Sequence, residues 1–217
     1  GGFFTSRRMV IDPRDRAHAL ILLDPEANVS DWKTGLVRVN PDGTMGDTLT
    51  IPDTPWEEPT IEASIDRGDG NNSMSVNLVP FGPGEHAVLS PKGYFIHGIN
   101  LDYTITLLRE DAPVLRIQKD YSPVPVAGGE RAEEEARAIR NMRYTDPNWR
   151  WNGPPIPEVK PPYERFYAGE DGTIWVKIHQ PARKVEDPSY DPADPDAIAN
   201  EWREPILFDV FDQDGSY

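Results

Sequence analysis

The chain of 217 residues contains no cysteine. Disulfide bonds, thiolate metal sites and cysteine nucleophiles are therefore excluded. No apolar run reaches the roughly 18 residues that a membrane-spanning helix requires, so we expect no direct membrane insertion. Apolar residues make up only 37% of the chain, but six Trp, eight Tyr and seven Phe are present. Because disordered chains are poor in aromatic residues, we expect a folded protein with a partly aromatic core.

Positive charge is also scarce. The 22 Lys and Arg residues stand against 37 Asp and Glu residues, which gives a net charge of −15. Such a charge repels phosphate backbones and anionic lipid headgroups, so we expect no nucleic-acid partner. Solubility is the simplest role of this acidity, and a basic surface on another protein is the partner that it favours.

Recognised catalytic patterns are missing as well. The chain has no G-x-S-x-G elbow, no phosphate-binding loop, no G-x-G-x-x-G and no H-E-x-x-H sequence. A zinc site would need distant histidines to converge through folding, because none has a second ligand two to four positions away. These histidines are His18, His86, His97 and His179. We therefore expect no enzyme activity, no cofactor and no metal, with weak calcium binding in the acidic loop at 187–196 as the open alternative.

An apolar run that enters an acidic or proline-containing turn ending in glycine recurs four times. The segments are 36–51, 88–98, 167–178 and 207–217. Asp or Asn favours the start of a turn and Gly supplies a positive φ, so each segment predicts a β-hairpin. The predicted turn glycines are Gly43, Gly93, Gly172 and Gly215. A fifth hairpin is predicted at 103–117, with its turn near Glu110–Pro113.

These hairpins combine into three four-stranded units of unequal length. The first joins 8–23 to the hairpin around Gly43, and the second joins the hairpin around Gly93 to 103–117. The third joins the hairpins around Gly172 and Gly215 across a long loop. Radial repetition of such units is how β-propellers protect the edges of their sheets.

The segments VNPDGTMGDTLTIP, LSPKGYFIHG, AGEDGTIWVK and FDVFDQDGSY resemble six-bladed β-propellers related to NHL repeats, a group common among bacterial exported proteins. The resemblance covers 36–51, 88–117 and 163–217. It implies a mainly β fold of antiparallel four-stranded blades, about three of them, and a core position between blades for Trp175. A compact β-sandwich built from the same hairpins is the alternative.

The two ends of the sequence suggest a piece of a longer protein. The chain begins GGFFTSRRM rather than with Met, so we expect processing or a preceding segment. It ends in LFDVFDQDGSY, where the strand that should return from the turn is missing. We expect either the C-terminal part of a propeller or a last strand completed by another part of the fold or by a partner.

One helix is predicted, at 128–146. Glu in its first turn and Arg later suit the helix dipole. A thin apolar stripe is formed by residues spaced at helical intervals, which are Ala132, Ala136, Ile139 and Met142. We expect one mainly β domain over 1–217, with a surface helix and a Trp/Pro-rich connection inserted at 128–163.

The connection NWRWNGPPIPEVKPPY (148–163) is the candidate partner-binding segment. Five prolines keep such a segment extended, and Trp, Tyr and Arg dominate the energetic centres of protein interfaces. The candidate residues are Trp149, Arg150, Trp151, Pro155 and Tyr163. The alternative is that Trp149 and Trp151 pack under the body of the protein and fix the connection to it.

The pattern as a whole predicts a non-catalytic protein-binding or scaffold module outside the cytoplasm, either periplasmic or secreted. Its most concrete form is an extrinsic subunit of a respiratory or photosynthetic membrane complex. Two alternatives belong to other classes. One is a propeller hydrolase or lactonase with a metal at the central channel, and the other is a lectin that stacks a sugar on Trp149 or Trp151.

Overall fold

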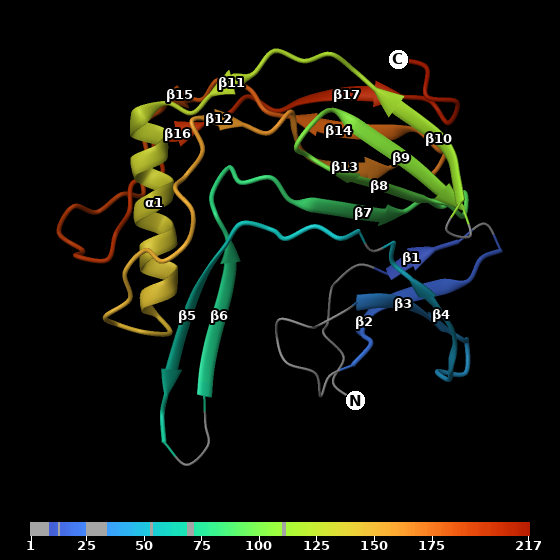
Figure 1. The fold of residues 1–217 in the computed structure, drawn as a ribbon, viewed down its shortest axis with the longest axis horizontal. Helices are drawn as coiled ribbons and strands as arrows, with labels where there is room; N and C mark the ends of the chain where they lie inside the picture. The colour runs from blue at the N-terminus through green and yellow to red at the C-terminus, as the bar shows by residue number, and fades with distance from the viewer. Residues whose placement is uncertain (1–8, 13, 25–33, 53, 69–71, 110–111) are drawn as a thin grey trace.

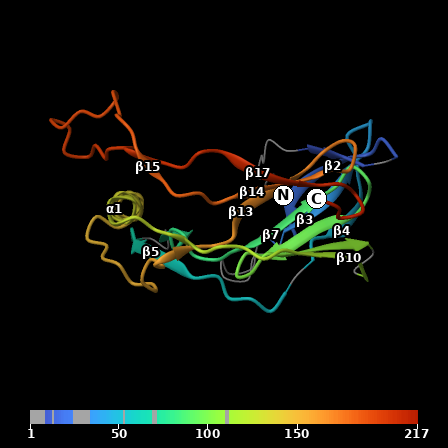
Figure 2. The ribbon, with the colours of Figure 1, turned by 90° about the horizontal axis from the view of Figure 1, so that it is seen from above.

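The computed structural model describes residues 9–12, 14–24, 34–52, 54–68, 72–109 and 112–217. It is mainly β, with antiparallel sheets and one helix, as predicted (Figure 1). The described residues do not form a closed propeller, and the sheets are small. Figure 2 shows the helix at one end of the molecule and the larger sheets at the other.

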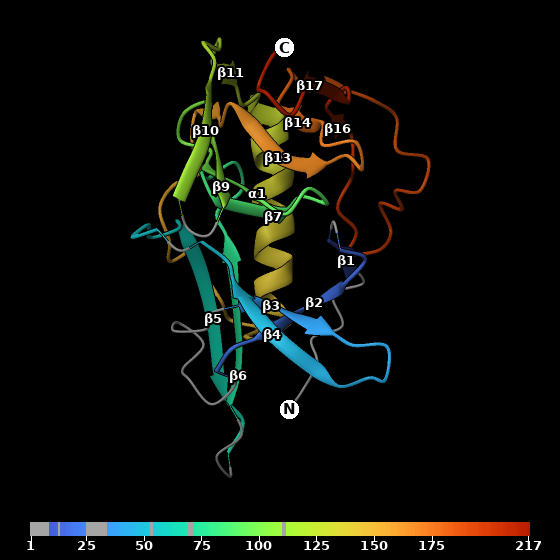
Figure 3. The same ribbon diagram turned by 90° about the vertical axis from the view of Figure 1, so that its right-hand side faces the viewer.

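The N-terminal sheet is a four-stranded meander in the order β1-β2-β3-β4. Its strands are β1 (Met9–Ile11), β2 (Ala17–Leu22), β3 (Thr34–Val39) and β4 (Met45–Thr50). A separate two-stranded hairpin follows, formed by β5 (Thr60–Asp66) and β6 (Asn72–Leu78). This hairpin extends past the C-terminal end of the helix and away from the other sheets (Figures 1 and 3).

Two further sheets form the upper part of the molecule in Figure 1. The first is another four-stranded meander, made of β7 (Glu85–Leu89), β8 (Phe95–Ile99), β9 (Thr104–Arg109) and β10 (Ala112–Gln118). The second has the order β13-β14-β17 and consists of β13 (Tyr163–Ala168), β14 (Ile174–Ile178) and β17 (Leu207–Phe211). The two sheets meet where β13 contacts β7.

The predicted chain reversals are confirmed at all four turn glycines. Gly43, Gly93, Gly172 and Gly215 have φ angles of 81°, 82°, 97° and 79°, a region that only glycine adopts without strain. The amide of each donates to the carbonyl of the residue three positions earlier, which closes a tight turn. The fifth hairpin is confirmed by the pairing of Arg109 with Ala112, while residues 110 and 111 of its predicted turn lie outside the described residues.

The larger core lies between the β7–β10 and β13–β17 sheets and is rich in aromatic side chains. It includes Tyr94, Tyr103, Tyr163, Phe166 and Phe211 together with Ile and Val side chains. Trp175 does not belong to it: this ring is 43% exposed, so the predicted core position is wrong. Alternation along β14 turns its neighbours Ile174 and Val176 inward, which leaves Trp175 on the opposite face against Phe208.

The predicted helix is confirmed as α1 (Gly128–Arg143). Its expected apolar stripe is only partly right, because Met142 is buried but Ala132 is exposed. Two acidic side chains of the helix, Glu130 and Glu133, are buried as well. No helix among the described residues has the length and apolar character needed to cross a bilayer.

Short strand pairs connect the helix to the rest of the chain. Before and after it, β11 (Val124–Pro125) pairs with β12 (Val159–Lys160), so the helix leaves and re-enters the fold at one place. On the other side, β15 (Arg183–Lys184) pairs with β16 (Trp202–Arg203), and β16 contacts the helix. A smaller core joins the helix to the β5–β6 hairpin through Ile61, Ala63, Ala138, Met142 and Trp149.

Candidate interaction surface

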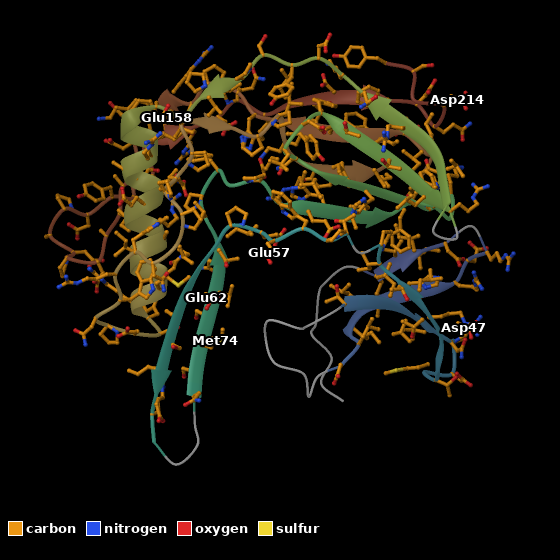
Figure 4. The ribbon with its side chains drawn as sticks, viewed as in Figure 1. Asp47, Glu57, Glu62, Met74, Glu158 and Asp214 are labelled. Atoms are coloured by element: carbon orange, nitrogen blue, oxygen red, sulfur yellow. The ribbon has the colours of Figure 1, made fainter. Side chains whose placement is uncertain are left out.

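The β5–β6 hairpin, called the arm below, has two faces of different character. In its register Thr60 pairs with Leu78, Glu62 with Val76, and Ser64 with Met74. Paired residues of an antiparallel hairpin point to the same side, so these six side chains share one face, the outer face. Its three apolar members are Met74, Val76 and Leu78, which are 45%, 38% and 45% exposed. Figure 4 shows Met74 and Glu62 on the arm.

The inner face of the arm is packed against the helix. Ile61 and Ala63 are buried beside Met142 and Trp149. Further along the arm, the Ser75 hydroxyl lies 2.6 Å from the hydroxyl of Thr145, just beyond the end of α1. The arm is therefore held on one side, while its outer face leaves a row of apolar side chains in contact with water.

The two edges of the arm also differ. The backbone of Glu62 on β5 is bonded to two side chains of the connection. Its carbonyl accepts the Trp149 indole N–H at 2.6 Å and the Asn152 amide at 2.8 Å, and its own N–H donates to Asn152 at 3.3 Å. Antiparallel pairs alternate in the direction of their backbone groups, so the groups of Val76, opposite Glu62, point toward the other edge. Among the described residues no strand pairs with that edge of β6.

Acidic side chains surround this surface. Residues 57–79 contain five acidic residues and one basic residue. Glu57, Glu58 and Glu62 line a hollow of about 540 Å³ at the base of the arm, together with 152–154. The Glu58 carboxylate also accepts the backbone N–H of Glu85 at 2.8 Å, which ties the base of the arm to β7. The outer face therefore carries an apolar row that is surrounded by acidic side chains.

The structure separates the five predicted partner-binding residues into buried and exposed ones. Trp149 is 4% exposed, and Tyr163 lies fully inside the larger core. Both rings are covered by the chain itself, so in this structure neither offers a surface to a partner. The burial of Trp149 also removes it as a stacking surface for a sugar. Trp151 is partly buried against the smaller core, so the alternative interpretation, that the Trp pair fixes the connection, describes what is observed.

The remaining candidates, Arg150 and Pro155, are exposed, and partner binding by them stays a prediction. Sequence reasoning missed the arm itself. Its signal was present in the alternating run Met74-Ser75-Val76-Asn77-Leu78. That pattern indicates a strand with an apolar face, and the ordinary reading would place the face in the core.

A buried ion network fastens the helix that supports the arm. The Lys160 ammonium has no exposed surface and donates to Glu130 at 2.5 Å and to Glu204 at 2.9 Å. Glu204 also accepts from the His179 ring and from the backbone N–H of Gln180. Burial alone would raise the pKa of Glu204, but these hydrogen bonds outweigh it and lower the pKa to about 2. The network is closed on itself, which indicates a structural role.

Two buried polar atoms, one in the larger core and one on a ring that contacts it, lack partners among the described residues. They are the hydroxyl of Tyr163 and Nε2 of His86, whose rings lie 5.9 Å apart between centroids. Burial, with help from the nearby charge of Arg165, lowers the pKa of His86 to about 4. Within the described residues, no group of three or more His, Asp or Glu side chains is arranged to hold a metal ion.

Comparison of the chain with protein-family models, with curated proteins and with solved structures gave no significant match.

Proposed function

We propose that this protein is a non-catalytic binding module that docks a protein partner on the outer face of the arm. One observation carries the proposal: Met74, Val76 and Leu78 stand in a row on a strand whose second edge is unpaired among the described residues. Exposed apolar side chains beside an open strand edge favour strand addition, in which backbone hydrogen bonds supply affinity and alternate side chains supply specificity.

The charge around the arm supports a partner of basic character. The surface around the apolar row is acidic, and the whole chain carries a net charge of −15. A second copy of the chain would bring the same charge and be repelled. The occupant we propose is an extended segment of another protein in which apolar residues alternate with Lys or Arg.

A finer proposal places the module outside the cytoplasm, as an extrinsic subunit of a larger membrane-associated complex and a relative of six-bladed propellers. Support comes from the four-stranded meander β7–β10 and from its contact with the neighbouring sheet through β7 and β13. β-Propellers are likewise built from four-stranded sheets that stand side by side around a central channel. The acidic composition supports a partner with a basic surface.

Synthetic peptides test the docking proposal. The full chain is titrated with a labelled nine-residue peptide that alternates Val and Lys, and fluorescence anisotropy reports binding at fixed ionic strength. We expect saturable binding, and weaker binding by at least about tenfold for the variant Met74→Ser/Val76→Thr/Leu78→Ser. The matched control is Val114→Thr on β10, another exposed apolar residue, which should bind as the unaltered chain does.

Three outcomes contradict the proposal. The first is equal binding of a peptide that alternates Val and Glu, because charge complementarity would then play no part. The second is unchanged binding by the triple variant. The third is sedimentation analysis in which the unaltered chain is a dimer and the triple variant a monomer, since the outer face would then join two copies.

A further inference from the structure

A cavity of about 700 Å³ separates the N-terminal sheet from the β7–β10 sheet. Figure 1 shows this boundary on the right, where β1 and β4 lie beneath the ends of β9 and β10. Four basic side chains line the cavity, which we call the basic pocket: Arg14, Arg16, Lys92 and Arg109. They come from three separate turns or strand ends, so the fold rather than the local sequence brings them together. In a chain with 22 bases and a net charge of −15, such a concentration is unexpected.

Asp12 is the one acidic side chain among the described residues that line the pocket, and it is already occupied. Its carboxylate accepts from Arg16 Nε at 2.7 Å and lies 3.0 Å from the ring nitrogen Nε2 of the buried His18. It also accepts the backbone N–H groups of Arg14 and Arg16. Burial would raise the pKa of Asp12, but these partners hold it well below its usual range. Asp12 thus fixes the turn that carries Arg14 and Arg16. Because its carboxylate is engaged there, it does not neutralise Lys92 or Arg109.

The other three cations have no ion-pair partner in the part of the chain that the structure describes. With the acidic side chains of the described residues, Arg14, Lys92 and Arg109 form no salt bridge within 4.0 Å. Lys92 is near Asp171 and helps to lower the pKa of that carboxyl, after the larger effect of the hydrogen bond from Thr173. Like charges around one cavity repel each other, so the binding of an anion lowers the electrostatic repulsion among the basic side chains.

The remaining lining suits a small organic anion. Leu89, Phe95 and Leu108 provide an apolar part of the wall, and Thr48 and Thr50 add hydroxyl groups. The volume falls in the range of roughly 300–1,000 Å³ that is typical of ligand pockets. Guanidinium groups match carboxylate and phosphate oxygens in pairs, which favours oxyanions over halide ions.

We propose that the basic pocket binds a small multivalent oxyanion, a molecule that carries two or more carboxylate or phosphate groups. Arg14 and Arg109 contact it from opposite sheets, Lys92 contributes a third charge, and Arg16 is oriented by Asp12 at the wall. This site is independent of the arm and of the partner proposed for it.

Calorimetric titration of the full chain tests the site with two probes, pyrophosphate and citrate, at constant ionic strength. We expect at least one of them to bind at a single site and to raise the melting temperature. Tighter binding of pyrophosphate identifies phosphate as the ligand group, and tighter binding of citrate identifies carboxylate. Arg14→Gln and Arg109→Gln should each weaken binding by about tenfold, since each removes one charged hydrogen-bonding group.

The matched control is Arg116→Gln, on the exposed surface of β10 and outside the pocket, which should leave the affinity unchanged. The triple variant of the arm should also bind both probes normally, so failure of one proposal is distinguishable from failure of the other. The proposal is overturned if neither probe binds, or if Arg116→Gln weakens binding as much as Arg109→Gln does. Urea unfolding of each variant confirms that the comparison is made between folded proteins.

Discussion

The indole N–H of Trp149 donates a 2.6 Å hydrogen bond to the backbone carbonyl of Glu62, 87 positions earlier in the chain. This bond joins the connection after the helix to the strand that carries the arm. The Trp149 ring itself is buried and contacts Trp151 edge-to-face, with 6.1 Å between centroids. The residue that the sequence marks as a partner contact is therefore the one that holds the arm in place.

Replacement of Trp149 should destabilise the fold rather than merely weaken partner binding. We expect Trp149→Ala to lower the free energy of unfolding by about 3–5 kcal/mol, because it empties a large buried site. Trp149→Phe keeps most of the packing and loses the hydrogen bond, so a loss of about 1–3 kcal/mol is expected. Urea unfolding measures both. The exposed Trp175→Ala serves as the control, and an effect as small as its own would place Trp149 on the surface instead.

Removal of the Lys160 ammonium should be equally costly. Lys160→Met leaves Glu130 and Glu204 facing each other without a positive charge, and breaking a buried pair in this way costs about 3–5 kcal/mol. Lys184→Met removes an exposed pair with Glu201 and should change stability by less than about 1 kcal/mol. Equal losses in the two variants, measured by thermal or urea unfolding, would contradict a closed, water-excluded network.

The half-buried ring of His86 makes stability depend on pH. The folded protein keeps this ring neutral down to about pH 4, whereas in the unfolded chain it takes up a proton near its ordinary pKa of 6.5. Unfolding therefore binds a proton between these values, and the free energy of unfolding falls as the pH is lowered from 6.5 to 4. At about 1.4 kcal/mol per pKa unit, the contribution is at most about 3.5 kcal/mol.

The variant His86→Phe isolates this effect, because it keeps a ring at the site and has no proton to gain. The difference in unfolding free energy between the two proteins should change with pH between 6.5 and 4, and be constant above pH 7. Glu204, whose pKa is lowered to about 2, loses its stabilising effect at lower pH, below about 4.5. A difference that does not vary with pH would mean that His86 has the same pKa in the folded and the unfolded protein, which contradicts this prediction.

Local chemistry explains what the sequence predicts well. The turn at Gly172 follows from an Asp-Gly pair: Asp171 accepts the N–H and the hydroxyl of Thr173, and Gly172 takes the positive φ. These contacts lie within three residues, so the local amino-acid sequence is sufficient to predict the turn. The length of α1 follows in the same way from its Glu-rich start and Arg-rich end.

Partners that are distant in the chain explain what the sequence does not predict. Glu133 belongs to the charged face of α1, yet it is buried because its carboxylate accepts the backbone N–H groups of Glu201 and Trp202. The spacing of residues along the helix does not predict a contact with those distant amides. Alternation in β6 likewise shows that Met74, Val76 and Leu78 share a face, but not that this face points away from the core. The basic pocket cannot be predicted from the sequence for the same reason, since its basic residues come from separate turns and strand ends.

The attachment of α1 has a thermal consequence. Beside its apolar contacts, the buried side of α1 is held by ionised groups, with Lys160 between two carboxylates and Glu133 on two amides. Water solvates charges less favourably as temperature rises, so the penalty for enclosing them shrinks on heating and grows on cooling. The ionic part of this attachment is therefore relatively weaker near freezing and relatively stronger in the warm.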